Sequence, residues 1–193
     1  MDKKQHKQEL LNQLYEPYKN CSLCPLAQLG RTTIVFGEGN PDARLILIGE
    51  GPGRDEDLQG RPFVGRPGKL QNKALELAGI CRQDLYIANI VKCRPPNNRA
   101  PSPQEIATCK KLLLDKQIEI IAPQVICTLG SSATNALLNE KVSITKIRGK
   151  KFTYQNIAII PTFHPAYILR NGKELTKMVR DLQNAFNYSL NNS

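Results

Sequence analysis

The sequence contains no tryptophan, and only two histidines and two methionines occur among its 193 residues. It also lacks any apolar run approaching the about 20 residues that a bilayer-spanning helix needs, so we expect no membrane partner. The opening residues, MDKKQHKQELLNQLYE, are charged and amphipathic, unlike the apolar centre of a secretory signal. These absences together predict a cytoplasmic protein.

Acidic residues are scarce relative to basic ones. The chain carries 17 Asp and Glu against 27 Lys and Arg, which gives a net charge of +10. Nucleic acid is the commonest partner of so basic a protein, but a basic surface with no such partner has the same composition. Charge alone leaves both interpretations open.

The six cysteines are not expected to form disulfides in a reducing compartment, where metal ligands or buried apolar residues are more usual. Cys21 and Cys24 form a C-x2-C pair, Cys93 follows an apolar run, and Cys109 lies in an expected helix. Four thiolates can hold zinc or a [4Fe–4S] cluster, and their spacing does not choose between these or no metal. We expect the other two cysteines, at positions 81 and 127, to be core residues.

Apolar runs alternate with amphipathic segments along the chain. Strands are expected at 43–49, 84–92 and 123–130, and in KKFTY and NIAIIPTF, which are joined by a turn at Gln155–Asn156. Helices are expected at 3–19, 65–80, 131–139 and 172–190, and in a segment that Ser102 caps, with Pro103 in its first turn and Glu105 completing a capping box. This order predicts one α/β domain over residues 1–193, a sandwich with a mostly parallel sheet.

Unusual residues follow three of the expected strands, at 49–57, 89–96 and 162–170. In parallel α/β sheets, ligands bind outside the carboxyl ends of the strands. The first of these segments, GEGPGRDED, is neither a dinucleotide fingerprint, because Arg54 stands where the third glycine belongs, nor a P-loop. It is either a flexible turn or a backbone that approaches a ligand closely. Its acids, Asp55–Asp57, are expected to be partly structural and to pair with Arg61 or Arg66.

Two polar side chains at these strand ends need partners. Asn89 interrupts the apolar run LYIANIV, and a buried amide without a partner costs about 1–3 kcal/mol. Its partner is either neighbouring backbone or a planar ligand with adjacent donor and acceptor groups. His164 directly precedes a proline suited to a first helical turn, where the helix dipole disfavours imidazolium, and it is either a catalytic or a structural residue.

The segments GEGPGRDEDLQGRPFVG (49–65), NIVKCRPPNNRAP (89–101) and HPAYILR (164–170), together with the four cysteines, closely resemble the family 4 uracil-DNA glycosylases. The resemblance runs from Cys21 to the last helix. It implies a three-layer α/β/α sandwich around a four-stranded, mostly parallel sheet. It also implies that Cys21, Cys24, Cys93 and Cys109, in the cluster-binding segments 21–24 and 93–109, hold a [4Fe–4S] cluster, behind an N-terminal helix within 1–20.

The resemblance further implies that the protein flips uracil out of DNA. Phe63 would stack on the base, Asn89 would bond its N3–H and O4, and His164 would donate to O2 as the glycosidic bond breaks. Glu50 and Gly51 would line the pocket near the sugar, with Glu50 our candidate for orienting water, since other uracil glycosylase families have aspartate where this chain has Gly51. Glu56 would lie near C5 of the base.

Contacts to the rest of the DNA are expected from HPAYILR. Ile168 and Leu169 would act as a wedge in the base stack and Arg170 would contact a phosphate. Further phosphate candidates are Lys92, Arg94, Arg99 and Arg148.

The resemblance therefore predicts a monomeric, monofunctional uracil-DNA glycosylase, a hydrolase of N-glycosidic bonds that begins base-excision repair on single- or double-stranded DNA. The alternative is an iron–sulfur or zinc module that binds nucleic acid without catalysis.

Overall fold

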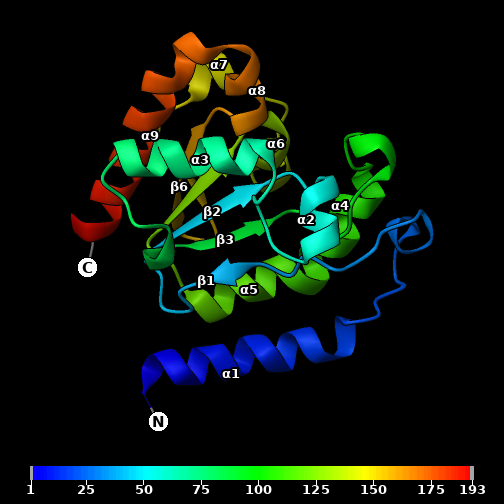
Figure 1. Cartoon of the computed structure of the whole chain (residues 1–193). Coiled ribbons are helices and arrows are strands. Elements are labelled where there is room, and N and C mark those ends of the chain that lie inside the picture. Colours follow the sequence, from blue (N-terminus) through cyan, green and yellow to red (C-terminus); the bar gives the residue numbers. More distant parts are fainter. Residues whose placement is uncertain (1, 192–193) are drawn as a thin grey trace.

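A computed structural model describes residues 2–191 of the chain. Its centre is one six-stranded sheet in the order β1-β3-β2-β4-β6-β5 (Figure 1). The strands are β1 Glu38–Gly39, β2 Leu45–Gly49, β3 Tyr86–Asn89, β4 Val125–Leu129, β5 Phe152–Tyr154 and β6 Ile157–Thr162. The inner four are mutually parallel, and β1 and β5 are antiparallel edges. The expected α/β class is confirmed, with a parallel core of four strands and two short edge strands beyond the expected number.

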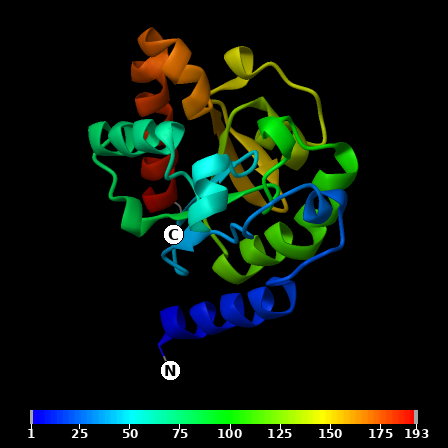
Figure 2. The same ribbon diagram turned by 45° about the vertical axis from the view of Figure 1, so that its right-hand side comes forward.

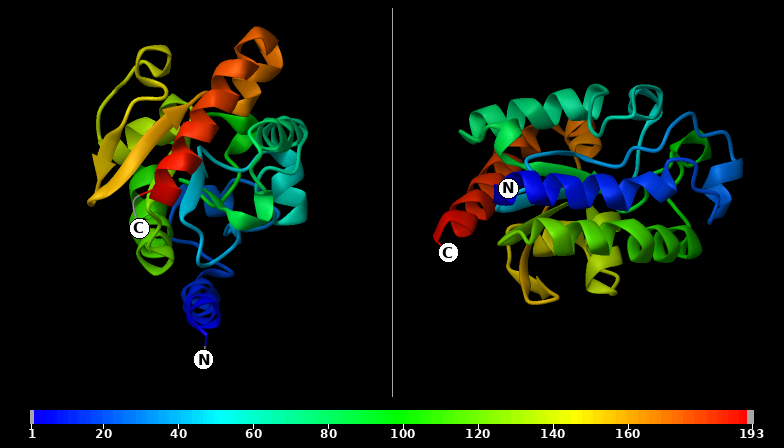
Figure 3. Two further views of the ribbon diagram at one scale, coloured as in Figure 1. Left: turned by 90° about the vertical axis from the view of Figure 1, so that its left-hand side faces the viewer. Right: turned by 90° about the horizontal axis from the view of Figure 1, so that it is seen from below.

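Helices cover both faces of the sheet. They are α1 Lys3–Tyr15, α2 Arg54–Gln59, α3 Arg66–Leu77, α4 Pro103–Cys109, α5 Asp115–Ile121, α6 Ser131–Leu138, α7 Ile144–Ile147, α8 Pro165–Arg170 and α9 Leu175–Asn191. Helices α3, α8 and α9 share a hydrophobic cluster with one sheet face, and α5 and α6 share a second cluster with the other. Helix α1 lies outside α5, at the edge of the molecule (Figure 3).

Strand β2 shows why the sheet is buried on both faces. Ile46 and Ile48 point into the cluster with α5 and α6, whereas Leu45 and Leu47 point into the cluster with α3 and α9. Because successive side chains of a strand alternate between faces, an unbroken apolar run is what a doubly covered strand requires. The sequence signal for β2 was therefore strong.

The helix that begins after Ser102 continues from α4 through a π-helical stretch into α5. The Ser102 hydroxyl accepts from the Glu105 amide and the Glu105 carboxylate accepts from the Ser102 amide, so the expected capping box is confirmed. The helix passes through a π-helical stretch, Lys110–Leu114, directly after Cys109. The turn at Gln155–Asn156 is also confirmed, with φ of 48° and 66° at its two residues.

Helix α2 accounts for the acidic cluster. Asp55, Glu56 and Asp57 occupy its first turn, where the helix dipole favours negative charge. The expected pairing with Arg61 or Arg66 was wrong, because Arg61 binds Glu38, Asp55 pairs with Arg54, and the carboxylate of Asp57 binds backbone amides. The helix itself could not be expected from periodicity, since its one large apolar side chain, Leu58, is exposed.

Asp57 fastens α2 to the segment that follows the cysteine pair. Its buried carboxylate accepts from the amides of Thr32 at 2.9 Å and Thr33 at 3.2 Å. Replacing Asp57 with alanine leaves these amides unpaired, and we expect the free energy of unfolding to fall by about 2–3 kcal/mol. Urea unfolding measures the change. Asp55→Ala, which removes a partly exposed carboxylate of the same turn, should cost at most about 1 kcal/mol, and equal costs would contradict this role.

Candidate active site

A cavity of about 590 Å³ lies at the carboxyl ends of the parallel strands. Figure 2 shows α2 in front of this edge, between α3 and the segment that leads into α4. Residues of the segments 49–57, 89–96 and 162–170, which follow three of the expected strands, line this cavity together. The residues expected at the site that line this cavity are Glu50, Gly51, Glu56, Phe63, Asn89, His164 and Arg170.

Asn89 is the last residue of β3 and is 1% exposed. No described residue offers a hydrogen-bond donor to its Oδ1 atom, which is buried. A Cβ atom at Gly49 would lie 2.5 Å from this oxygen and 2.4 Å from Cζ of Phe63, so only glycine at that position lets carboxamide and ring approach. The end of β3 therefore presents a buried acceptor without a partner to the cavity.

Phe63 lies in the loop between α2 and α3, with its side chain buried. Its φ of 53° lies in the left-handed region, which costs an L-residue about 1–2 kcal/mol. Its ring centroid is 6.0 Å from that of His164, with the planes inclined by 41°. Two aromatic rings and the Asn89 carboxamide thus border one space.

His164 caps α8, and its Nδ1 atom accepts from the Ala166 amide at 3.1 Å. A neutral imidazole that accepts at Nδ1 carries its proton on Nε2. Burial, and then the charge of Arg170, lower the pKa of His164 to about 4. The ring is therefore a neutral donor at neutral pH, as the helix start predicted.

Glu56 is buried, and all of its hydrogen bonds go to backbone. Oε1 accepts from the amides of Val64 at 2.9 Å and Gly65 at 2.7 Å, and Oε2 accepts from the Gly53 amide at 3.2 Å. The carboxylate joins the glycine-rich turn to the loop that carries Phe63. Glu56 also lines the cavity, so its expected position near C5 of the base stays a prediction beside this structural role.

Glu50 and Gly51 border the cavity directly after β2. Among the described residues, no group makes a hydrogen bond or ion pair with the Glu50 carboxylate, which leaves it available to a ligand. A Cβ atom at Gly51 would lie 2.8 Å from Cγ2 of Val91. A side chain at that position would have to displace Val91.

The two residues of α8 that were expected to act as a wedge, Ile168 and Leu169, differ in exposure. Ile168 is 1% exposed and packs in the core with α3 and α9, so its assignment as a wedge was wrong. Leu169 is 42% exposed, and Arg170 is exposed and lines the cavity. In a six-residue helix the sequence could not tell which of these neighbours faces the core.

Two of the expected phosphate contacts are instead engaged within the protein. Lys92 is 1% exposed and its Nζ donates to the Asn89 carbonyl at 3.0 Å. Arg148 forms an ion pair with the buried carboxylate of Asp181. Arg99 lines the cavity while it binds Glu105, and Arg94 donates to Asn98 Oδ1.

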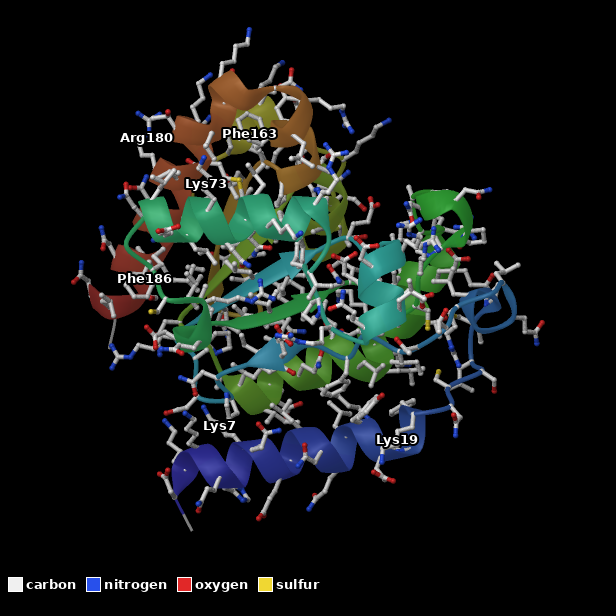
Figure 4. All side chains as sticks on the ribbon, viewed as in Figure 1. Lys7, Lys19, Lys73, Phe163, Arg180 and Phe186 are labelled. Carbon is white, nitrogen blue, oxygen red and sulfur yellow. The ribbon has the colours of Figure 1, made fainter. Side chains whose placement is uncertain are left out.

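The cavity is also lined by two exposed basic residues that were not expected to contact DNA, Arg54 and Arg66. Each is the first residue of a helix, Arg54 within the glycine-rich segment 49–65 and Arg66 directly after it, and that position was the available sequence signal. The remaining positive charge is spread widely. Figure 4 shows Lys7 on α1, Lys19 beyond the end of α1, Lys73 on α3 and Arg180 on α9.

The four cysteines of the expected cluster contact one hydrophobic cluster, in which Cys93 and Cys109 are buried and Cys21 and Cys24 are half-buried. Arg31 Nη1 donates to Cys93 Sγ at 3.1 Å, and the Lys92 amide donates to Cys109 Sγ at 3.3 Å. Within residues 2–191, no three or more His, Cys, Asp or Glu side chains are grouped as ligands of a single metal ion.

The two other cysteines differ from one another. Cys127 is buried in β4, as expected. Cys81 is exposed, so its expected place in the core was wrong.

No helix in the described part of the chain is long and apolar enough to span a bilayer.

Comparison with known proteins agrees with this geometry. The family model described as "Uracil DNA glycosylase superfamily" matches residues 36–187. The chain is 50% identical over 183 residues to the type-4 uracil-DNA glycosylase of Thermotoga maritima, covering 93% of this chain and 94% of that protein. It is 44% identical over 170 residues to that of Sulfurisphaera tokodaii, covering 83% and 76%, and 44% identical over 170 residues to that of Saccharolobus solfataricus, covering 83% and 78%. The chain therefore belongs to the uracil DNA glycosylase superfamily, among its type-4 members.

Proposed function

We propose that the protein is a monofunctional uracil-DNA glycosylase that hydrolyses the N-glycosidic bond of a flipped uracil and leaves an abasic site, the first step of base-excision repair. The observation that carries this proposal is the buried Asn89 Oδ1, which lacks a protein donor and borders the same cavity as Phe63 and a neutral histidine donor. Family membership supports the reaction class.

Uracil matches the carboxamide at the end of β3. Its N3–H donates to Oδ1 of Asn89, and its O4 accepts from Nδ2, while Phe63 stacks on the base. Cytosine presents an acceptor at N3 and a donor at N4. Its acceptor would face the Asn89 Oδ1 acceptor, and its donor would face the Nδ2 donor. Leaving such buried polar groups unpaired costs about 1–3 kcal/mol each, so cytosine is rejected.

The chemical step needs a donor where charge develops. When the bond between C1′ and N1 breaks, its electrons enter the base and negative charge grows on O2, where the Nε2–H of His164 donates. Glu50 faces the cationic sugar and orients the water whose oxygen forms the new bond to C1′, and the proton that this water loses neutralises the departing uracil anion. No lysine is among the described residues that line the cavity, so water rather than an amine is the nucleophile.

Access to a base in duplex DNA requires extrusion, which costs a few kcal/mol and is cheaper in single strands. Leu169 is the exposed apolar side chain placed to fill the vacated stack, next to Arg170 at the cavity. Arg54 and Arg66 supply further positive charge for the phosphates. We propose uracil-containing DNA, single- or double-stranded, as the substrate, and a monomeric, cytoplasmic enzyme.

We further propose that Cys21, Cys24, Cys93 and Cys109 hold a [4Fe–4S] cluster within one domain that spans the chain. The donor set fits, because four thiols lie in or against one hydrophobic cluster, Arg31 donates to Cys93 Sγ, and the charge of Lys92 offsets thiolate charge at Cys109. When bound, the cluster cross-links segments 21–24 and 93–109 and fixes the chain just beyond Asn89.

Protein purified without oxygen should therefore contain iron and inorganic sulfide in a ratio near one, with visible absorbance that a Cys109→Ala variant loses. Elemental analysis and absorbance spectroscopy measure both. Stoichiometric zinc in place of iron would show that the metal assignment is wrong.

The proposed activity is tested by uracil release from a single-stranded oligonucleotide and from a U:G duplex, with abasic sites detected by alkaline cleavage. We expect free uracil and strand cleavage with both substrates. DNA binding without release of uracil from either would instead support a non-catalytic module.

A further inference from the structure

The loop that presents Phe63 to the cavity is held in an unfavourable conformation. Phe63 is a bulky residue with φ of 53°, a region that such residues rarely occupy without support from their surroundings. Glu56 supports one side of the loop through the amides of Val64 and Gly65. Glu56 makes no hydrogen bond to Pro62, on the other side of Phe63, so a different group must hold that residue.

Arg82 supplies that support from outside the cavity. It begins a 3₁₀ turn, Arg82–Asp84, just before β3, and its Nη2 atom donates to the Pro62 carbonyl at 2.7 Å. The same guanidinium donates to Glu38 Oε1 at 2.9 Å and to Asn72 Oδ1 at 2.9 Å. One side chain thus ties the Phe63 loop to β1 and to α3.

Arg61 is a natural comparison within the same ion-pair group. Its Nε and Nη2 atoms donate to Glu38 at 2.7 Å and 3.1 Å, but it makes no hydrogen bond to the Pro62 carbonyl. Both arginines border a second cavity of about 490 Å³ behind the loop. Hydrogen bonds, and not side-chain packing alone, therefore hold the loop on this side.

We propose that Arg82 is a positioning residue for uracil recognition: its bond to the Pro62 carbonyl keeps Phe63 in the left-handed conformation that places its ring beside Asn89. Arg82 is not among the cavity-lining residues and acts only through Phe63. This inference rests on the proposed function, in which the Phe63 ring stacks on the flipped base.

The test compares Arg82→Gln with Arg61→Gln, since both remove one ion pair with Glu38. Single-turnover release of uracil from a single-stranded oligonucleotide should lose roughly 10- to 100-fold in kcat/KM for Arg82→Gln, the range for a lost charged hydrogen bond. Arg61→Gln should change it by less than about 2-fold. Arg82→Lys, which keeps one charged donor, should recover part of the loss.

A double-mutant cycle with Phe63→Ala separates positioning from general destabilisation. If Arg82 acts through the Phe63 ring, Arg82→Gln should have no further effect in the Phe63→Ala protein. Should Arg82→Gln not fold, Arg82→Lys takes its place in the cycle. Full additivity with Phe63→Ala, or equal effects of Arg82→Gln and Arg61→Gln, would overturn the proposal. Absence of uracil release by the native protein would instead refute the proposed function.

Discussion

Replacing Asn89 with alanine should lower the rate of uracil release by roughly 10²- to 10⁴-fold, because two hydrogen bonds of about 1–3 kcal/mol each are lost from a buried site. Asn89 is the last residue of β3 and is 1% exposed. The lower rate therefore reflects lost hydrogen bonds to the uracil base, because a side chain this buried does not contribute to the protein surface. Single-turnover release from a single-stranded oligonucleotide measures the effect.

Affinity for an oligonucleotide without uracil should be unchanged in Asn89→Ala, since phosphates and not the base edge supply that binding. Asn12→Ala provides the matched control, because Asn12 is exposed on α1 and its Oδ1 accepts from Gln8 of the same helix. An Asn89→Ala protein that releases uracil at close to the native rate would refute the assignment of the base-reading residue.

Replacing His164 with alanine should slow release by about 10²–10³-fold, the usual effect of removing one donor from a developing anion. The structure defines the donor, since the Ala166 amide occupies Nδ1 and leaves the proton on Nε2. His6→Ala, on the exposed part of α1, should leave the rate unchanged. Retention of near-native activity by His164→Ala would remove the imidazole from the mechanism.

The same histidine predicts the pH dependence of the reaction. Its pKa is lowered from 6.5 to about 4, so the ring is neutral above pH 5 and gains its proton only as pH falls through about 4. The native rate should therefore show no step near pH 6.5, and should fall at the acid end, where protonated Nδ1 would face the Ala166 amide. A rate that rises as pH falls through 6.5 would indicate a charged donor and contradict this assignment.

The sheet and the cavity were largely predictable because their signals are local. Unbroken apolar runs define β2 and β4, and glycine, asparagine and histidine at strand ends indicate the binding edge. Side-chain burial after a strand was not predictable. Lys92 reads as a surface cation, yet its stem is buried and its ammonium group binds the chain three residues back.

Contacts between segments that are far apart in the sequence could not be predicted either. The bond between Arg82 and the Pro62 carbonyl, and the bonds between Asp57 and Thr32, depend on how the loops meet after folding. The left-handed conformation of Phe63 is set by these contacts and by Gly68, where a Cβ atom would lie 2.0 Å from the Phe63 carbonyl oxygen. A sequence pattern can place such residues near one another without specifying which groups bond.

The central claim is that the N3–H of a flipped base donates to Asn89 Oδ1, and it is tested most directly by removing that one donor from the substrate. Release of uracil and of 3-methyluracil by the native protein should be compared in the same single-stranded oligonucleotide. The account predicts rapid release of uracil and no detectable release of 3-methyluracil. Equal rates for the two bases would contradict it.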